Sequence, residues 1–162
     1  MNDLKFAIDM EHDGEKYYRQ QAEINKSNSF FTVCIMMAEE EKVHAQILTD
    51  MLNSEKLSKL PDANTLAKTK SIFEGIGDIK SEAKSIANQL DFYRFASNME
   101  QESIDLYTKH LSDSVNQQER DLFTYLIYQE KQHFEILDEL ASLLRNAEEW
   151  VESPEFGVRK EY

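Results

Sequence analysis

The sequence of 162 residues repeats itself at an offset of 89 positions. Segment 6–11 matches segment 95–100, and segment 41–48 matches segment 130–137. The polar residues kept in both copies include carboxylates, tyrosines and histidines, namely Glu11, Tyr18, Glu41 and His44 in the first copy and Glu100, Tyr107, Glu130 and His133 in the second. Such self-similarity predicts a fold built from two copies of one structural unit.

Both copies have the pattern of helices. Apolar residues recur at spacings of three and four along almost the whole chain, which is the period of an amphipathic helix. Four glycines and two prolines are too few for an all-β fold that turns about every ten residues. Hydrophobic residues make up 41% of the chain and charged residues 30%, so the chain can bury a core and is not a disordered polyelectrolyte. We therefore expect an all-α protein.

The turn formers divide this pattern into four long helices. We predict helices over 4–24, 29–53, 81–111 and 115–147, and a shorter helix over 64–74 inside a long connection. Ser114-Val115-Asn116-Gln117 fits a capping box at the start of the last helix. Two short turns and one long connection predict two antiparallel hairpins joined by a crossover, with the second and third long helices parallel. We expect residues 1–147 to form this four-helix bundle and residues 148–162 to form an irregular tail, packed on its own bundle or on a partner subunit.

The hairpins bring the repeated acids to one height in the bundle. Glu11 and Glu41 are equally far from the turn near position 26, and Glu100 and Glu130 are equally far from the turn near position 115. Each pair lies about 15 residues, or roughly 22 Å of helix, from its turn. All four carboxylates are therefore expected at mid-bundle.

The apolar seam of each helix includes these acids. The seam residues of the second and fourth helices are Cys34, Met37, Glu41, His44, Leu48 and Met51, and Phe123, Leu126, Glu130, His133, Leu137 and Leu140. On the other two helices, the small residues Gly14 and Ser103 follow Glu11 and Glu100 by one turn and leave room beside the carboxylates. Four ionised glutamates in an apolar core need compensating charge, which two divalent cations supply. Carboxylate oxygens and imidazole nitrogens suit first-row metals, so the pattern predicts a dinuclear metal site.

These motifs resemble the rubrerythrin-like branch of the ferritin-like di-iron carboxylate proteins. The signatures are Met10-Glu11 with Tyr18, Glu41-Lys42-Val43-His44, Met99-Glu100 with Tyr107, and Glu130-Lys131-Gln132-His133. The resemblance covers residues 3–147 and implies a ferritin-like bundle that binds two irons. It implies that Glu11, Glu41, His44, Glu100, Glu130 and His133 are the iron ligands, with glutamates bridging and each histidine capping one iron. It also implies that Tyr18 and Tyr107 hydrogen-bond to ligand carboxylates and orient them.

The resemblance implies an oxidoreductase that reduces hydrogen peroxide, or dioxygen, and is restored by an external electron donor. Full-length rubrerythrins carry a rubredoxin-like iron site with two Cys-x-x-Cys pairs, whereas Cys34 is the only cysteine here. We therefore expect a separate rubredoxin-like donor. Prototypical members also have a ligand carboxylate at the position of Ser103, so the redox-linked ligand exchange attributed to that carboxylate is in question.

Other functions stay open at this point. The same ligands serve iron storage, buffering, delivery or a ferroxidase-type activity without peroxidase turnover, and they accept manganese as well as iron. A third possibility is a metal-free helical interaction module whose acids decorate its surface.

Charge and hydropathy limit the partners. Because the net charge is −13, we expect no nucleic-acid or anionic-membrane partner. The longest uncharged run, 27–38, is too short to cross a bilayer, and the first residues lack the basic and apolar regions of a signal peptide. We expect a cytoplasmic homodimer.

Several chemically active side chains lie off the predicted site. We expect the acids Glu39 and Glu40 and the histidines His12 and His110 to face solvent. We expect Cys34 to be a buried structural thiol rather than a redox group.

Overall fold

The computed structural model describes residues 2–55, 60–61, 64–86 and 90–152, and every regular element in these ranges is a helix. The helices are α1 (Asn2–Ile24), α2 (Phe30–Leu52), α3 (Thr65–Glu74), α4 (Ile79–Ser85), α5 (Leu90–Asp113) and α6 (Gln117–Glu152). The predicted all-α fold is confirmed. No helix among the described residues is long and apolar enough to cross a membrane.

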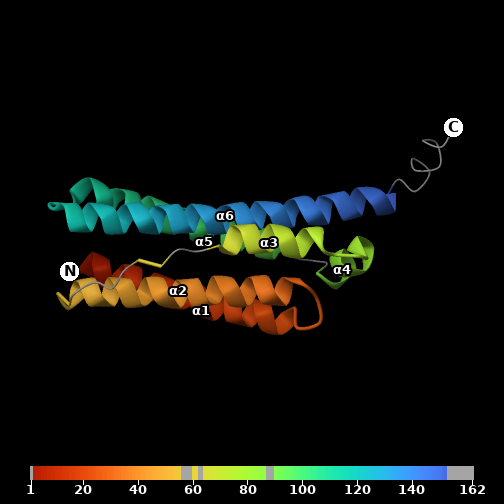
Figure 1. The fold of residues 1–162 in the computed structure, drawn as a ribbon, viewed down its shortest axis with the longest axis horizontal. Coiled ribbons are helices and arrows are strands. Elements are labelled where there is room, and N and C mark those ends of the chain that lie inside the picture. Colours follow the sequence, from red (N-terminus) through yellow and green to blue (C-terminus); the bar gives the residue numbers. More distant parts are fainter. Residues whose placement is uncertain (1, 56–59, 62–63, 87–89, 153–162) are drawn as a thin grey trace.

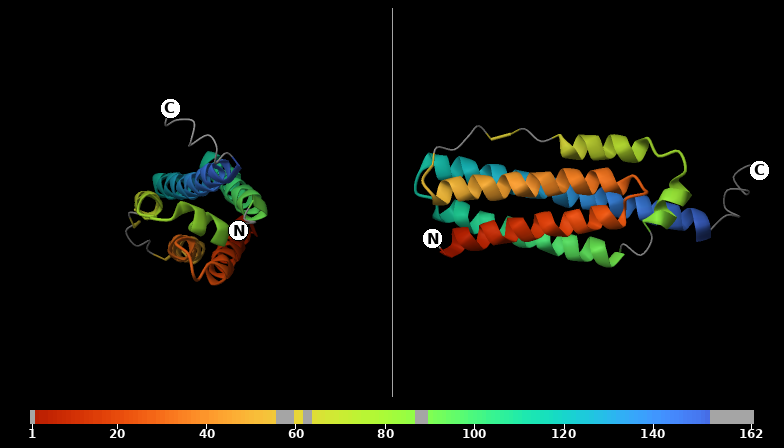
Figure 2. Two further views of the ribbon diagram at one scale, coloured as in Figure 1. Left: turned by 90° about the vertical axis from the view of Figure 1, so that its right-hand side faces the viewer. Right: turned by 90° about the horizontal axis from the view of Figure 1, so that it is seen from below.

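The four long helices α1, α2, α5 and α6 form a bundle of two antiparallel hairpins (Figure 1). Helix α3 runs along the outside of the bundle, and α5 starts at the same end as α2 and runs parallel to it (Figure 2). The short helix α3 packs against both α2 and α6, and α4 packs against α6. This is the topology predicted from the two short turns and the one long connection.

The third predicted helix begins later than expected. Residues 79–85 form the separate helix α4, and α5 starts only at Leu90. Helix α4 is held by a tertiary contact, because the Glu82 carboxylate accepts a 2.8 Å hydrogen bond from the backbone N–H of Ser29 at the start of α2. That contact, together with the fully buried Ile86, fixes α4 at the end of the bundle.

The fourth predicted helix differs at both ends. Its capping residue is Asn116, whose side chain accepts a hydrogen bond from the Glu119 N–H, while the Glu119 carboxylate accepts one from the Val115 N–H. The predicted capping box starting at Ser114 is therefore wrong by two residues. Helix α6 also continues to Glu152, past the expected end at 147. Residues 153–162, most of the predicted tail, lie outside the described residues.

The apolar core is divided into two clusters along the bundle. One cluster gathers around Tyr18, Phe30 and Leu137, and the other around Leu48 and Leu126. A layer of buried polar side chains lies between them at mid-bundle, where the repeat predicts the acids.

Candidate metal centre

Six carboxylate and imidazole side chains meet in this polar layer, and all are buried. They are Glu11 from α1, Glu41 and His44 from α2, Glu100 from α5, and Glu130 and His133 from α6. Nδ1 of His44 lies 3.1 Å from Oε1 of Glu130 on the other hairpin. Nδ1 of His133 lies 2.8 Å from Oε1 of Glu41 and 3.3 Å from Oε1 of Glu100. The structure therefore brings together all six residues that the sequence singles out.

The six side chains divide into two overlapping groups that could each hold a metal ion. Within each group the potential ligand atoms lie within 4.8 Å of one another. The first group is Glu11, Glu41, His44 and Glu130, and the second is Glu41, Glu100, Glu130 and His133. Glu41 and Glu130 belong to both groups, so they are placed to bridge two ions, whereas Glu11 and Glu100 each belong to one.

Two buried tyrosines connect the hairpins at this layer. The hydroxyl of Tyr18 on α1 donates a 2.5 Å hydrogen bond to Oε1 of Glu100 on α5. The hydroxyl of Tyr107 on α5 donates in the opposite direction, to Oε1 of Glu11 on α1. Burial and the neighbouring carboxylates raise the pKa of both phenols well above the ordinary value, so both stay protonated donors.

The charge of the layer is unbalanced without a cation. Burial, followed by the charge of Glu11, raises the pKa of Glu41 and of Glu130 well above the ordinary value. Burial opposes ionisation of Glu11 too, but hydrogen bonding to Glu41 and the charge of His44 lower its pKa to about 2. In the metal-free protein, protons on Glu41 and Glu130 thus reduce the repulsion among four clustered carboxylates.

Unsatisfied oxygen atoms indicate what the layer lacks. Glu11 Oε2, Glu41 Oε1 and Glu130 Oε2 are buried and accept no hydrogen bond from the described residues. Glu41 Oε1 does lie close to His133, but without the geometry of a hydrogen bond. A buried carboxylate oxygen without a donor is costly, and a divalent cation is the partner that oxygen and imidazole ligands favour. The residues present therefore fit a pair of divalent metal ions.

The rubrerythrin family model matches residues 2–141. The chain belongs to the rubrerythrin family. The matched region includes both hairpins and all six residues of the polar layer, and it confirms the resemblance inferred from the sequence motifs. No curated protein and no solved structure matches the chain significantly.

The two small residues that follow Glu11 and Glu100 by one turn, Gly14 and Ser103, have different neighbours. A Cβ atom added to Gly14 would lie 3.0 Å from Oε2 of Glu41, so the glycine leaves the space that the carboxylate occupies. Ser103 is buried, and its hydroxyl donates a hydrogen bond to the Met99 carbonyl of its own helix.

One residue beside the layer contradicts its prediction. Glu40 was expected to face solvent, but its side chain is largely buried and its Oε2 lies 2.6 Å from Nε2 of His133. Its other oxygen accepts a hydrogen bond from the hydroxyl of Thr65 on α3. Glu39, by contrast, is exposed and pairs with Arg19 at 2.8 Å, as expected for a surface acid. The sequence signal for a role of Glu40 is its position directly before the Glu-x-x-His motif. The position of α3, which brings Thr65 to Glu40, could not be predicted from the sequence.

The remaining candidates lie apart from the layer. Cys34 is buried, as expected, and burial raises the pKa of its thiol. His12 is exposed, as expected. His110 was expected to face solvent but is half-buried, because its ring stacks on Phe123 with centroids 5.0 Å apart. None of these three residues belongs to either metal-binding group.

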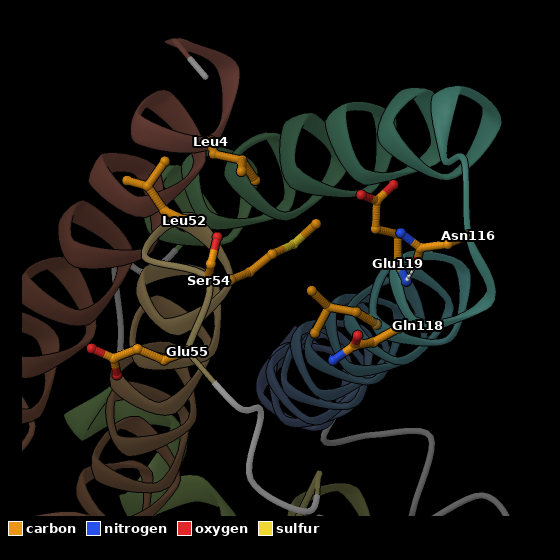
Figure 3. Close-up of a pocket in the computed structure, with 9 residues that line it drawn as sticks. Leu4, Leu52, Ser54, Glu55, Asn116, Gln118 and Glu119 are labelled. Carbon is orange, nitrogen blue, oxygen red and sulfur yellow. Dashed lines mark hydrogen bonds between the residues drawn. The ribbon is translucent and has the colours of Figure 1, made fainter.

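A pocket of about 440 Å³ lies at one end of the bundle, away from the polar layer. It is bounded by the start of α1, the end of α2 and the start of α6, with Leu4 and Leu52 on one side and Asn116, Gln118 and Glu119 on the other (Figure 3). None of the six site residues lines this pocket. The polar layer instead lies between the two apolar clusters, and all six of its carboxylate and imidazole side chains are buried.

Proposed function

We propose that this rubrerythrin-family protein is a non-haem di-iron oxidoreductase that reduces hydrogen peroxide with electrons from an external protein donor. The observation that carries the proposal is the pair of buried Glu/His groups that share Glu41 and Glu130. Two ferrous ions at such a site supply the two electrons that, with two protons, convert one hydrogen peroxide molecule into two water molecules. The burial of all six residues favours a substrate as small as hydrogen peroxide or dioxygen.

The protein's own residues have distinct roles in this proposal. Glu11 with His44 would hold one metal ion and Glu100 with His133 the other, and Glu41 and Glu130, which belong to both groups, would contribute to both. Tyr107 and Tyr18 orient Glu11 and Glu100 through their hydroxyl groups, and their high pKa keeps the phenolic proton in place as a donor. The apolar clusters on both sides exclude bulk water and strengthen these electrostatic interactions.

The electron donor is proposed to be a separate rubredoxin-like protein. Cys34 is the only cysteine in these 162 residues, and it is buried, so it supports no second iron site of the Cys-x-x-Cys type. The proposal includes a homodimer in the cytoplasm. The net charge of −13 argues against nucleic-acid and anionic-membrane partners.

The second candidate function is iron storage or a ferroxidase-type activity without peroxidase turnover. It is favoured by Ser103, which supplies no carboxylate at the position where prototypical rubrerythrins have an additional ligand. Manganese is a further possibility, because the same oxygen and nitrogen ligands accept it.

Steady-state turnover distinguishes the two functions. The iron-loaded protein is mixed with hydrogen peroxide and a reduced rubredoxin-type donor, and donor oxidation is followed against a sample without the protein. Repeated turnover that is lost in Glu41→Ala supports the peroxidase. Iron uptake and a single oxidation with no further donor consumption support storage and contradict the peroxidase. Metal analysis of the purified protein identifies the native ion.

A further inference from the structure

We propose that Glu40 and Thr65 are positioning residues that make the two metal positions unequal, with the ion at His133 bound more tightly than the ion at His44. The inference rests on the dinuclear centre proposed above and adds an order of filling to it. It follows from a difference between the two halves of the duplicated site.

Both histidines turn the same ring nitrogen toward the carboxylates. Nδ1 of His44 lies 3.1 Å from Glu130 and 3.5 Å from Glu11. Nδ1 of His133 lies 2.8 Å from Glu41 and 3.3 Å from Glu100. Nδ1 is therefore the nitrogen that faces the metal position in each half, and Nε2 is the outer nitrogen.

The outer nitrogen of His133 has a strong partner. Nε2 lies 2.6 Å from Oε2 of Glu40, and Oε1 of Glu40 accepts the hydroxyl proton of Thr65. A neutral imidazole carries one N–H, so donation of Nε2–H to Glu40 leaves the lone pair of Nδ1 directed at the metal. An anionic acceptor also makes the imidazole a stronger ligand. Glu40 thus fixes the orientation of the ring before any metal binds, and it keeps the proton on Nε2 when a metal replaces the proton on Nδ1.

The outer nitrogen of His44 lacks such support. Its Nε2 is buried and has no hydrogen-bond partner in the part of the chain that the structure describes. Its ring is instead in edge-to-face contact with the ring of Tyr125, with centroids 6.3 Å apart. The position equivalent to Glu40 in the sequence repeat is Gln129, a buried residue without charge. The duplication therefore preserves the ligands and differs in what holds the histidines.

The crossover between the hairpins provides the second difference between the two halves of the site. Thr65 is the first residue of α3 and is buried, and its carbonyl accepts a hydrogen bond from the hydroxyl of Thr69 one turn later. Helix α3 packs on α2 and α6, the two helices that carry Glu40 and His133. Among the described residues of the crossover, Thr65 supplies a hydroxyl to the His133 half of the site, and His44 Nε2 receives none. The crossover helix is thereby part of the metal centre's support.

The test is a titration of the metal-free protein with Co²⁺ alone, followed by calorimetry and visible absorption. We expect two binding steps of unequal affinity in the wild-type protein, the tighter of which is lost in His133→Ala. Glu40→Gln is expected to weaken that tighter step by about 10–100-fold and to leave the other step unchanged. Thr65→Val is expected to weaken the same step by a smaller factor.

The matched control is Glu39→Gln, which makes the same change of charge one residue away on an exposed side chain. It is expected to leave both steps unchanged. In the Co²⁺ protein, the Nε2 proton of His133 gives a paramagnetically shifted, exchangeable NMR signal, and Glu40→Gln is expected to speed its exchange with water. A merely structural role of Glu40 does not predict this selective change.

The outcomes separate this inference from the proposed function. Two equal steps in the wild-type protein, unaltered by Glu40→Gln, overturn the inference and leave the metal centre intact. Equal weakening of both steps in Glu40→Gln, with a lower melting temperature of the metal-free variant, also overturns it, because the residue then acts only on stability. Absence of any Co²⁺ binding to the wild-type protein overturns the metal centre together with the inference.

Discussion

Tyr18 on α1 donates a 2.5 Å hydrogen bond to Glu100 on α5, and both residues are almost fully buried. The equivalent pair, Tyr107 and Glu11, makes the same connection in the opposite direction. Each hairpin therefore orients a carboxylate of the other hairpin. The two copies of the repeat depend on one another at the polar layer, where a change in one hairpin affects the ligands of the other.

Removal of either tyrosine hydroxyl is expected to destabilise the protein. In Tyr18→Phe and in Tyr107→Phe, a buried carboxylate loses its donor, which costs about 1–3 kcal/mol of unfolding free energy. Urea unfolding of the metal-free variants measures the loss. Tyr128→Phe is the control, because the Tyr128 side chain is 59% exposed. This variant is expected to be as stable as the wild-type protein. Unchanged stability in both buried variants would contradict the proposed orienting role.

Substitution of the shared acids is expected to differ from substitution of the unshared ones. Glu41→Ala and Glu130→Ala each remove a residue common to both metal-binding groups, so both ions should be lost or strongly weakened. Glu11→Ala removes a residue from one group only and should retain one ion per chain. Metal analysis after loading and desalting counts the ions, with the exposed acid variant Glu102→Ala as the control. Identical metal counts in all four variants would refute the assignment of ligands.

Gly14→Ala is expected to separate folding from metal binding. Alanine favours a helix interior over glycine by about 1 kcal/mol, so in the metal-free variant this gain offsets the cost of the close contact with Glu41. The added Cβ lies 3.0 Å from Oε2 of Glu41, however, and displaces this carboxylate. Metal affinity should therefore fall, whereas Gly77→Ala, whose Cβ meets no atom within 4 Å, should leave it unchanged. Calorimetric titration of both variants with a divalent metal measures these affinities.

The metal-free protein is expected to lose stability as the pH rises. The pKa values of Glu41 and Glu130 are raised well above 4.5, and the pKa of His133 is raised well above 6.5. Between the ordinary pKa of each group and its raised pKa, the folded state therefore binds more protons than the unfolded state. Their contribution is present at low pH and is lost as the pH rises through the raised pKa values. Glu11, with a pKa of about 2, contributes a constant amount above about pH 5.

Urea unfolding in the presence of a chelator, from about pH 5 to pH 8, measures this trend. Glu41→Gln removes one of the raised carboxyl groups and should flatten the slope. Metal loading should reverse the trend, because metal ions compete with the same protons for the ligands. A metal-free protein whose stability rises over this range would contradict the assignment of protons to Glu41 and Glu130.

The helical pairing and the height of the site could be predicted from the sequence because both follow from spacing. The offset of 89 positions specifies two hairpins, and equal distances of Glu11 and Glu41 from their turn specify a common level. Gly14 was also predictable as a residue that leaves room for a carboxylate. The ligand roles of the six residues stay predictions that the metal analysis above tests.

The remaining features depend on contacts between segments far apart in the chain. Glu82 of α4 accepts a hydrogen bond from the backbone of Ser29, a partner 53 residues away. Glu40 turns inward because His133 and Thr65 approach it from α6 and α3. Periodicity within one helix contains no information about such partners. From the sequence alone, Glu40 is therefore expected to face solvent like the neighbouring Glu39.

The most direct measurement is an anaerobic titration of the metal-free protein with ferrous iron, followed by one equivalent of hydrogen peroxide. We expect two irons bound per chain and rapid growth of a near-ultraviolet absorption band typical of an oxo-bridged diferric centre. Failure to bind iron stoichiometrically would contradict the account, and the polar layer would then be structural, with the family relationship limited to the fold.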